Sequence, residues 1–160
     1  MVCNIDFFKV YNDTYGYSAG NICLQHVVSI IKETVKRPAA LMTRYRGEGS
    51  AVVLSNTDAV SGVLVAEEIR ARVGALKTND ASSDRSQDMI ISLGVAMLVP
   101  AQQLSLTPLI ALADQALYQV KTAGHECLLL TETLRERHRP KGRSRYSTAT
   151  ARVPEISRQL

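Results

Sequence analysis

The sequence predicts one α/β domain in which helices cover a mixed central sheet, and three observations predict this class. The 160 residues are 46% hydrophobic and 21% charged, a composition typical of one soluble globular domain and not of a fibrous or disordered chain. Two hydrophobic periods alternate along the chain, one of about 3.6 residues and one of two. Helical segments separate most of the strand segments, and parallel neighbours in a sheet need such crossovers.

Five segments have the short apolar runs expected of strands, and they are residues 1–5, 41–45, 51–54, 89–99 and 127–130. The second and third are rich in Val, Leu and Tyr, which favour strands. Five residues with two glycines separate them, which suits a tight turn and predicts a β-hairpin.

Three segments repeat apolar residues at three- and four-residue spacing, which predicts amphipathic helices at residues 19–36, 58–76 and 106–123. Pro38 stops the first helix, and Gly124 ends the third in the C′ position. The side chains expected to face the core from the first two helices are Ile22, Cys23, Val27, Ile30, Ile31, Thr34, Val35, Val60, Val63, Leu64, Ile69, Val73 and Leu76.

The cysteines argue against both a disulfide framework and a zinc site. Cys3, Cys23 and Cys127 are odd in number, are widely spaced and form no Cys-x-x-Cys pair, so we expect buried apolar side chains. No apolar run approaches the roughly 18 residues that a membrane span needs. Residues 1–6 lack the basic and apolar regions of a signal peptide, and we therefore expect a cytoplasmic protein without a transmembrane segment.

The net charge of +4 belongs to the end of the chain. Residues 135–160 contain eight Lys or Arg and two Glu, which gives +6 and leaves −2 for residues 1–134. Residues 132–160 have almost no apolar periodicity and are rich in Arg, Ser, Thr and Pro, so they cannot bury enough surface to offset their ordering entropy. We expect a disordered basic tail there, which is either simply solvated or a contact for polyanions such as nucleic acid or acidic lipid.

Three widely separated segments carry a family resemblance, namely N-I-D-F-F-K-V-Y-N-D-T-Y-G at 4–16, R-Y-R-G-E-G-S-A-V-V-L at 44–54 and A-D-Q-A-L-Y-Q-V-K-T-A-G at 113–124. Together with A-E-E-I-R at 66–70 and I-S-L-G-V-A at 91–96, they resemble the GGDEF domain, the diguanylate cyclase family, in the family's order and with matching gaps. The resemblance implies a nucleotidyl cyclase-like fold with a ferredoxin-like βαββαβ core. It also implies an ancestral reaction that condenses two GTP into cyclic di-GMP across a homodimer.

The resemblance covers residues 1–131, which we expect to form the GGDEF-like domain. Relatives carry a helical segment with an Asp-x-Leu-Thr string ahead of the first strand, and this sequence begins with that strand. We expect either a fragment of a longer signalling protein or a sheet with one open face.

A cyclase of this kind needs carboxylates that hold two Mg²⁺, because hard oxygen ligands suit this ion and paired cations stabilise the entering and leaving oxygens. Of the three carboxylates that the resemblance implies, only the catalytic Glu48 is present, since Asn4 and Gly49 replace the other two. A neutral amide cannot offset cation charge. Asp6 lies on the same strand face as Asn4 and could compensate as a metal ligand. Alternatively, Glu48 is an exposed hairpin acid without a task.

The hairpin departs from the family's Gly-Gly-Asp/Glu-Glu-Phe motif, because it reads Arg46-Gly47-Glu48-Gly49-Ser50. Arg46 adds a Cβ and a cationic stem where glycine lets a ligand approach the backbone. It therefore obstructs the site or offers a fork for phosphate. Ser50 removes a large apolar anchor, and we expect a looser hairpin tip.

The residues that the resemblance assigns to the nucleotide are partly retained, and they are Phe7, Phe8, Lys9, Asn12, Asn21, Lys121 and His125. The first three match a turn whose backbone N–H groups meet phosphates, and Lys121 matches a phosphate-binding lysine. The amide of Asn12 can donate to and accept from the guanine edge, whereas Asn21 replaces a carboxylate and His125 an arginine. The alternatives are an Asx turn for Asn12 and an ordinary last-turn charge for Lys121.

An inhibitory product site of the family is an Arg-x-x-Asp, of which this chain keeps Arg37 and has Ala40 in place of the aspartate. Without that carboxylate, the guanine of cyclic di-GMP lacks its partner. We therefore expect only a remnant of this site.

These losses favour a degenerate GGDEF signalling domain that is catalytically inactive and acts as a regulatory or dimerising module in cyclic di-GMP signalling. It would bind GTP or GDP weakly, with Mg²⁺ present only when a nucleotide is bound. Its protein partner would be a second copy or another GGDEF or signalling protein. Two alternatives are an active diguanylate cyclase in which Asp6 and Glu48 hold the metals, and an interaction fold without any ligand.

Overall fold

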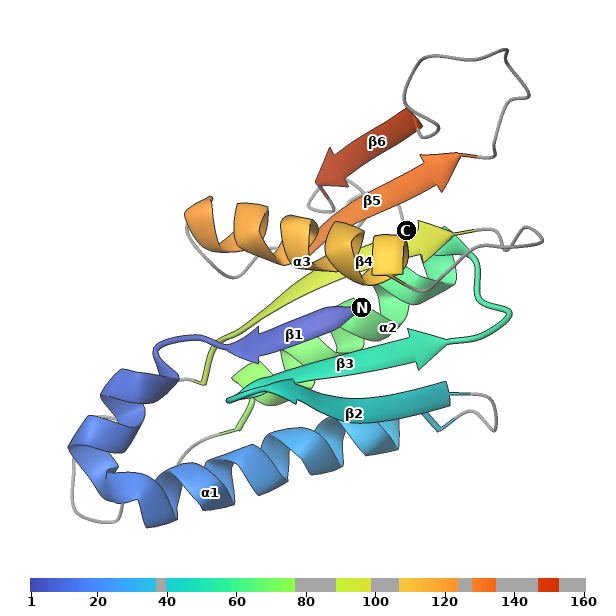
Figure 1. The fold of residues 1–160 in the computed structure, drawn as a ribbon. Coiled ribbons are helices and arrows are strands. Elements are labelled where there is room, and N and C mark those ends of the chain that lie inside the picture. Colours follow the sequence, from blue (N-terminus) through green and yellow to red (C-terminus); the bar gives the residue numbers. More distant parts are fainter. Residues whose placement is uncertain (37–39, 77–88, 99–106, 124–127, 135–146, 153–160) are drawn as a thin grey trace.

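The computed structural model describes residues 1–36, 40–76, 89–98, 107–123, 128–134 and 147–152. Its elements, in chain order, are β1 (Val2–Ile5), α1 (Phe8–Thr34), β2 (Ala40–Arg46), β3 (Gly49–Leu54), α2 (Ala59–Gly74), β4 (Ile91–Leu98), α3 (Thr107–Thr122), β5 (Leu128–Leu134) and β6 (Ser147–Arg152) (Figure 1). The predicted succession of strand, helix, hairpin, helix, strand, helix and strand is confirmed through β5. None of the helices in these ranges is long and apolar enough to cross a membrane.

The strands form one mixed sheet in the order β2-β3-β1-β4-β5-β6. Among the strands that the structure describes, only β4 and β5 are parallel, and α3 provides the crossover between them, as a parallel pair requires. The first four strands, with α1 and α2 between them, have the ferredoxin-like βαββαβ order, so the predicted fold class is confirmed. The hairpin turn is shorter than predicted, because Arg46 already pairs with Gly49 and only two residues connect the strands.

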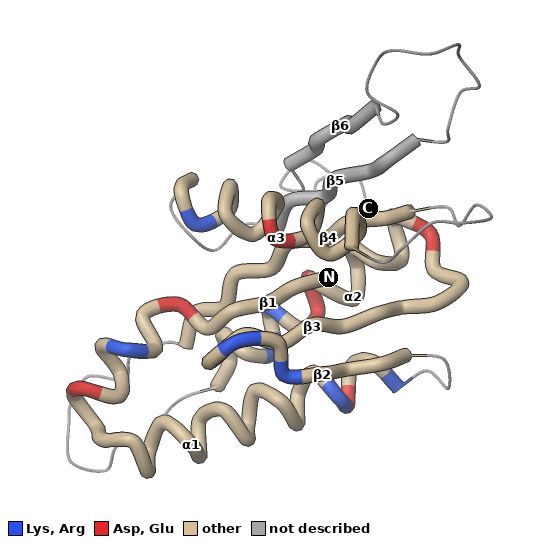
Figure 2. Tube along the Cα trace, viewed as in Figure 1, with Lys and Arg blue, Asp and Glu red and all other residues tan. Residues whose placement is uncertain are grey.

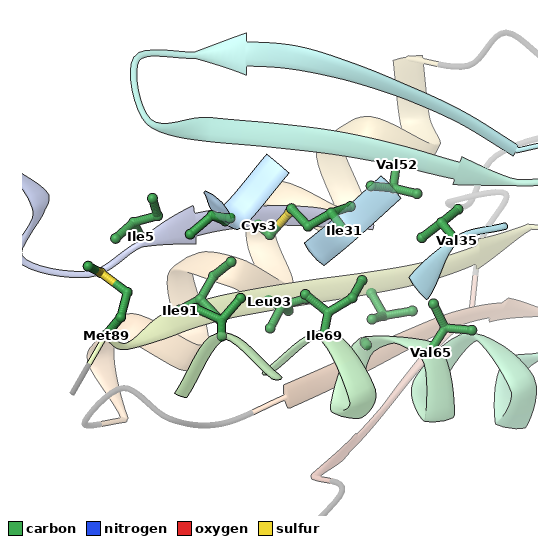
Figure 3. Close-up of a cluster of buried hydrophobic side chains, with 14 of the residues drawn as sticks. Cys3, Ile5, Ile31, Val35, Val52, Val65, Ile69, Met89, Ile91 and Leu93 are labelled. Carbon is green, nitrogen blue, oxygen red and sulfur yellow. The ribbon is translucent and has the colours of Figure 1, made fainter. Parts of the chain in front are cut away.

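Alternate side chains of β1 point to opposite faces of the sheet, and helices cover both faces. Cys3 and Ile5 face the main core, which contains the buried apolar residues of α1 and α2 and includes Ile31, Ile69 and Leu93, each at most 1% exposed (Figure 3). The helix α3 packs on the opposite face of the sheet. Its backbone approaches β4 closely at Gly94, where a Cβ would lie 2.2 Å from the carbonyl oxygen of Ala113.

The first helix begins eleven residues earlier than the predicted 19–36, because α1 starts at Phe8 and bends at Gly16. Gly16 has φ 85° and ψ 159°, a backbone conformation that glycine adopts without steric cost. The side chains between Lys9 and Ser18 are exposed or half-buried. The first turns of α1 therefore have no buried apolar stripe that hydrophobic periodicity could detect.

The helix faces differ in part from the prediction. Cys23, Val27, Ile31 and Val35 are buried, as are Val63, Ile69 and Val73. Three residues predicted to face the core are instead exposed, because they lie on the outer edge of their helices, namely Ile22 (55%), Val60 (58%) and Leu64 (52%). Small residues, Gly20 and Ala66, take part of the buried space instead.

The end of the chain differs from the predicted tail within the described residues. The strand β5 continues to Leu134, and β6 pairs with it antiparallel, so residues 132–134 and 147–152 are extended and hydrogen-bonded. A run of Ser, Thr and Ala with no apolar alternation gave no signal for this pairing. The predictions for the remaining tail, Pro38, Gly124 and Cys127 lie outside the described residues.

Candidate functional site

The polar face of β1 carries the first group of candidate residues. Asn4 and Asp6 project from the face opposite the main core, toward α3, as their two-residue spacing predicted. Asp6 is only 5% exposed although it is acidic. Ser92, which is buried on β4, donates a 2.5 Å hydrogen bond from Oγ to Asp6 Oδ2. Sequence reasoning missed Ser92, because nothing in its local pattern marks a partner 86 residues away.

The hairpin turn places Glu48 above this face. Gly49 pairs with Asn4 across β3 and β1, and the preceding turn residue, Glu48, then lies within reach of the asparagine. The Nδ2 of Asn4 donates a 3.1 Å hydrogen bond to Glu48 Oε1. The turn is held by Gly47, which has φ 49°, and by a 2.8 Å hydrogen bond from Arg44 Nε to the Gly47 carbonyl. Glu48 is thus linked to Asn4 on β1.

Lys121 completes the network from the last turn of α3. Its Nζ donates a 2.5 Å hydrogen bond to Asn4 Oδ1 and lies 3.5 Å from Asp6 Oδ1. The ammonium lies between Asn4 of β1 and Asp6, which directly follows that strand. A continuous chain of contacts therefore runs from Ser92 through Asp6, Lys121 and Asn4 to Glu48.

These residues do not fit the two magnesium ions that the family resemblance implies. A cation needs oxygen ligands with lone pairs directed at it, whereas the group facing Glu48 is an N–H donor of Asn4. An ammonium already lies beside the Asp6 carboxylate. Within the described residues, no three His, Cys, Asp or Glu side chains gather in a way that could hold a metal ion.

A groove of about 380 Å³ lies beside this network, between α1 and the hairpin. Its apolar lining comes from Leu24, Val28 and Met42, and its polar lining includes Asn21, Gln25, Lys32, Arg44 and Glu48. Figure 2 shows basic residues on β2 at this end of the sheet. A lining that combines apolar with polar and basic side chains suits a heterocycle that carries negative groups. The contributions of Gln25, Lys32 and Arg44 were not predicted, since no motif marked them as ligands.

Apart from Lys121, the predicted nucleotide residues that the structure describes lie in this groove or in the first part of the chain around the start of α1. Asn21 lines the groove, whereas Asn12 is not among its lining residues and packs instead against Gly20, where a Cβ would lie 1.8 Å from Asn12 Oδ1. Phe7 precedes α1 in the left-handed region (φ 54°), an uncommon conformation for a bulky residue.

Phe8 and Lys9 follow Phe7 as the first residues of the helix, where backbone N–H groups have no partner inside the helix and can meet phosphate. Arg37 and His125 lie outside the described residues.

One contact ties the hairpin to α3 independently of the predicted residues. Tyr45, the extra residue where the register of β2 and β3 shifts, donates a 3.0 Å hydrogen bond from its hydroxyl to Asp114 Oδ2. This hydrogen bond to a carboxylate raises the pKa of Tyr45 above its ordinary value. Arg46 stacks its guanidinium 5.6 Å from the centre of the Tyr45 ring, so its side chain is engaged on the hairpin itself.

Together, the βαββαβ sheet and the polar cluster at one end of β1 define a nucleotidyl cyclase-like domain. Residues 1–127 match the family described as diguanylate cyclase, GGDEF domain. Diguanylate cyclase A of Treponema denticola is 36% identical over 132 residues, which are 82% of this chain and 34% of that protein. The probable diguanylate cyclase DgcT of Escherichia coli is 32% identical over 134 residues, or 84% of this chain and 29% of that protein.

A solved structure gives the same answer for the fold. The GGDEF domain of DgcB from Caulobacter crescentus, crystallised in complex with c-di-GMP, matches with a TM-score of 0.73 at 29% identity, over 81% of this chain and 74% of that one. The chain therefore belongs to the GGDEF family of diguanylate cyclase domains, which act in cyclic di-GMP signalling. It spans about a third of the length of the two curated relatives.

Proposed function

We propose that this domain has lost cyclase activity and serves cyclic di-GMP signalling as a regulatory or dimerising module that binds guanine nucleotides weakly. The hydrogen bond from Asn4 to Glu48 carries the proposal. In this hydrogen bond, one oxygen of Glu48, which is the one carboxylate present of the three that the family resemblance implies, accepts from the N–H group of Asn4. A metal-binding cyclase needs an oxygen acceptor in the place of that N–H donor.

Weak nucleotide binding is supported by the groove and by the start of α1. The groove offers Asn21 and apolar lining residues to a base, and the first-turn N–H groups of α1 offer donors to phosphates. Any Mg²⁺ would enter with the nucleotide and rely mainly on the nucleotide's own phosphates, because the protein supplies few free carboxylate oxygens. A second copy of the chain or another GGDEF or signalling protein is the proposed protein partner.

The test of inactivity is product formation. Purified protein at high concentration is incubated with GTP and either Mg²⁺ or Mn²⁺, and cyclic di-GMP is measured by mass spectrometry, with a GGDEF protein of known activity as the positive control for the assay. We expect no product beyond the level of a protein-free sample. Multiple turnovers per chain would refute the proposal.

Calorimetric titration with GTP, GDP and cyclic di-GMP tests the binding part. We expect saturable heat for GTP and GDP. Leu24→Arg should reduce it, because this substitution places a long charged side chain in the lining of the groove. Ile22→Arg is the matched control, because Ile22 is exposed on the same helix and does not line the groove. No saturable heat with any nucleotide would favour a pure interaction fold.

One observation favours a second candidate, an active cyclase. Asp6 and Glu48 are both present and are linked by two hydrogen bonds and one ion pair through Asn4 and Lys121, so a rearrangement of Asn4 and Lys121 could turn both carboxylates toward a metal. In that case Glu48→Ala abolishes product formation. An unchanged rate in Glu48→Ala would eliminate this candidate.

A further inference from the structure

The polar network on β1 contains a cation that belongs to the protein itself. The side chain of Asp6 is 0% exposed, and that of Lys121 is 34% exposed, with 3.5 Å between Oδ1 and Nζ. The lysine thus reaches from solvent at the end of α3 to a carboxylate that solvent cannot reach. A buried carboxylate is stable only with hydrogen-bond donors or a cation beside it. Ser92 supplies a donor to one oxygen, and Lys121 supplies the cation.

A divalent ion would need the same oxygens. Ligand distances are about 2.0–2.1 Å for Mg²⁺ and only slightly longer for related ions. A metal that bridges Asn4 Oδ1 and Asp6 Oδ1 would therefore need the space that Nζ fills, 2.5 Å from the first oxygen and 3.5 Å from the second. Two cations this close repel strongly in a partly buried site. The ammonium in this position and a metal that bridges these two oxygens exclude one another.

We propose that Lys121 is the resident cation of this site and takes the place of a divalent ion between Asn4 and Asp6. The lysine acts as a positioning residue, because it holds the polar face of β1 in a form that needs no metal. For its functional meaning the inference rests on the proposed loss of cyclase activity, but it is tested without any nucleotide.

The probe is Mn²⁺ alone, added to the full chain and followed by electron paramagnetic resonance of the free ion and by thermal unfolding. We expect Lys121→Met to bind Mn²⁺ at least about tenfold more tightly than the wild type, because the methionine keeps the length of the side chain and removes its charge. The same variant should gain thermal stability on addition of Mn²⁺, which the wild type should not. Lys36→Met is the matched control, since Lys36 is an exposed lysine outside this network, and it should behave as the wild type.

A double variant locates the effect. Asp6→Asn/Lys121→Met removes the carboxylate as well, and we expect the gain in Mn²⁺ affinity to disappear. If Lys121→Met alone does not fold, recovery of folding in the double variant supports the proposal, since the defect is then an uncompensated carboxylate. Failure of the double variant to fold as well would overturn it.

Two results overturn the proposal directly. One is equal Mn²⁺ affinity of the wild type and Lys121→Met. The other is Mn²⁺ binding to the wild type that Asp6→Asn abolishes. Formation of cyclic di-GMP by the wild type would instead refute the proposed function, so the two failures are distinguishable.

Discussion

The side-chain amide of Asn4 donates a 3.1 Å hydrogen bond to Glu48, and its oxygen accepts a 2.5 Å hydrogen bond from Lys121. The two ends of one neutral side chain thus satisfy an anion from the hairpin and a cation from α3. An aspartate at this position could accept from Lys121, but it would repel Glu48. The asparagine therefore pairs with both charged groups at once.

Asn4→Asp should destabilise the domain, because it replaces a donor with a second anion opposite Glu48. Loss of a hydrogen bond to a charged group costs about 1.5–3 kcal/mol, of which the stronger contact with Lys121 recovers a part. We therefore expect a decrease of about 1–2 kcal/mol in the free energy of unfolding, measured in urea at pH 7. Asn4→Asp/Glu48→Gln should regain most of it, since Gln can donate to the new aspartate. Unchanged stability of Asn4→Asp relative to the exposed control Asn56→Asp would contradict the proposed role of the hydrogen bond.

Gly94→Ala should displace α3 from the sheet. The added Cβ would lie 2.2 Å from the Ala113 oxygen and 2.4 Å from the Leu117 nitrogen, and both are backbone atoms that cannot rotate away. We expect a loss of about 1–3 kcal/mol in the free energy of unfolding. Gly62→Ala is the matched control, because its Cβ would have its nearest contact at 3.9 Å and would favour the helix. Equal stabilities of the two variants would show that α3 does not pack on β4 as described.

Ile69→Ala and Leu64→Ala test the face of α2. Ile69 is 0% exposed in the main core, and removing its side chain should cost about 2–5 kcal/mol. Leu64 is 52% exposed on the same helix, and its truncation should change the free energy of unfolding by about 0.5 kcal/mol or less. Urea unfolding measures the loss of free energy of unfolding for both variants. A larger loss for Leu64→Ala than for Ile69→Ala would indicate that Leu64 is in the core, as its helical spacing predicted.

The elements that the sequence predicts well are those with local signals. The hairpin was predicted from the glycines between its two strands, and α2 from the apolar stripe over residues 58–76. The early start of α1 at Phe8 has no such signal, because its first turns bury little and bend at Gly16. Leu64 was predicted to face the core but is exposed, because helical spacing gives the period of the buried stripe and not its width.

The sequence predicts several residues of the candidate site but not the contacts between them. The family strings single out Asn4, Asp6, Glu48 and Lys121, but they cannot show that Lys121 points to β1. That contact depends on α3 crossing the sheet at Gly94, which is a tertiary relationship. Ser92 and Asp114 escape prediction altogether, because their partners are 86 and 69 residues distant.

Asp58 should contribute stability that depends on pH. Its carboxylate accepts from Ser61 N at 2.8 Å and from Ser61 Oγ at 2.9 Å at the start of α2, and these bonds, led by the backbone one, lower the pKa of Asp58. A lowered pKa means that the contribution is fully present above the ordinary value of 3.8 and is lost as the pH falls through the folded-state pKa. The stability difference between the wild type and Asp58→Asn should thus be constant near neutral pH and shrink below about pH 4.

Urea unfolding at several pH values measures this difference for Asp58. The control is Glu68→Gln, which removes one charge from the exposed face of α2 and leaves the cap intact. A difference between the wild type and Asp58→Asn that grows as the pH falls would contradict the assignment of the cap.

Cys3 and Cys23 should resist alkylation in the folded protein. Burial raises the pKa of each thiol to about 11, so that about one thiol in a thousand is ionised at pH 8. Cys3 also donates a hydrogen bond to the carbonyl of Ser50, and Cys23 lies 3.7 Å from the sulfur of Met89. Iodoacetamide should therefore label both residues far more slowly in buffer than in urea, as peptide mass spectrometry can show for each cysteine separately. Rapid labelling of Cys3 in buffer would mean that β1 leaves the sheet readily, which is incompatible with a stable contact between Asn4 and Glu48.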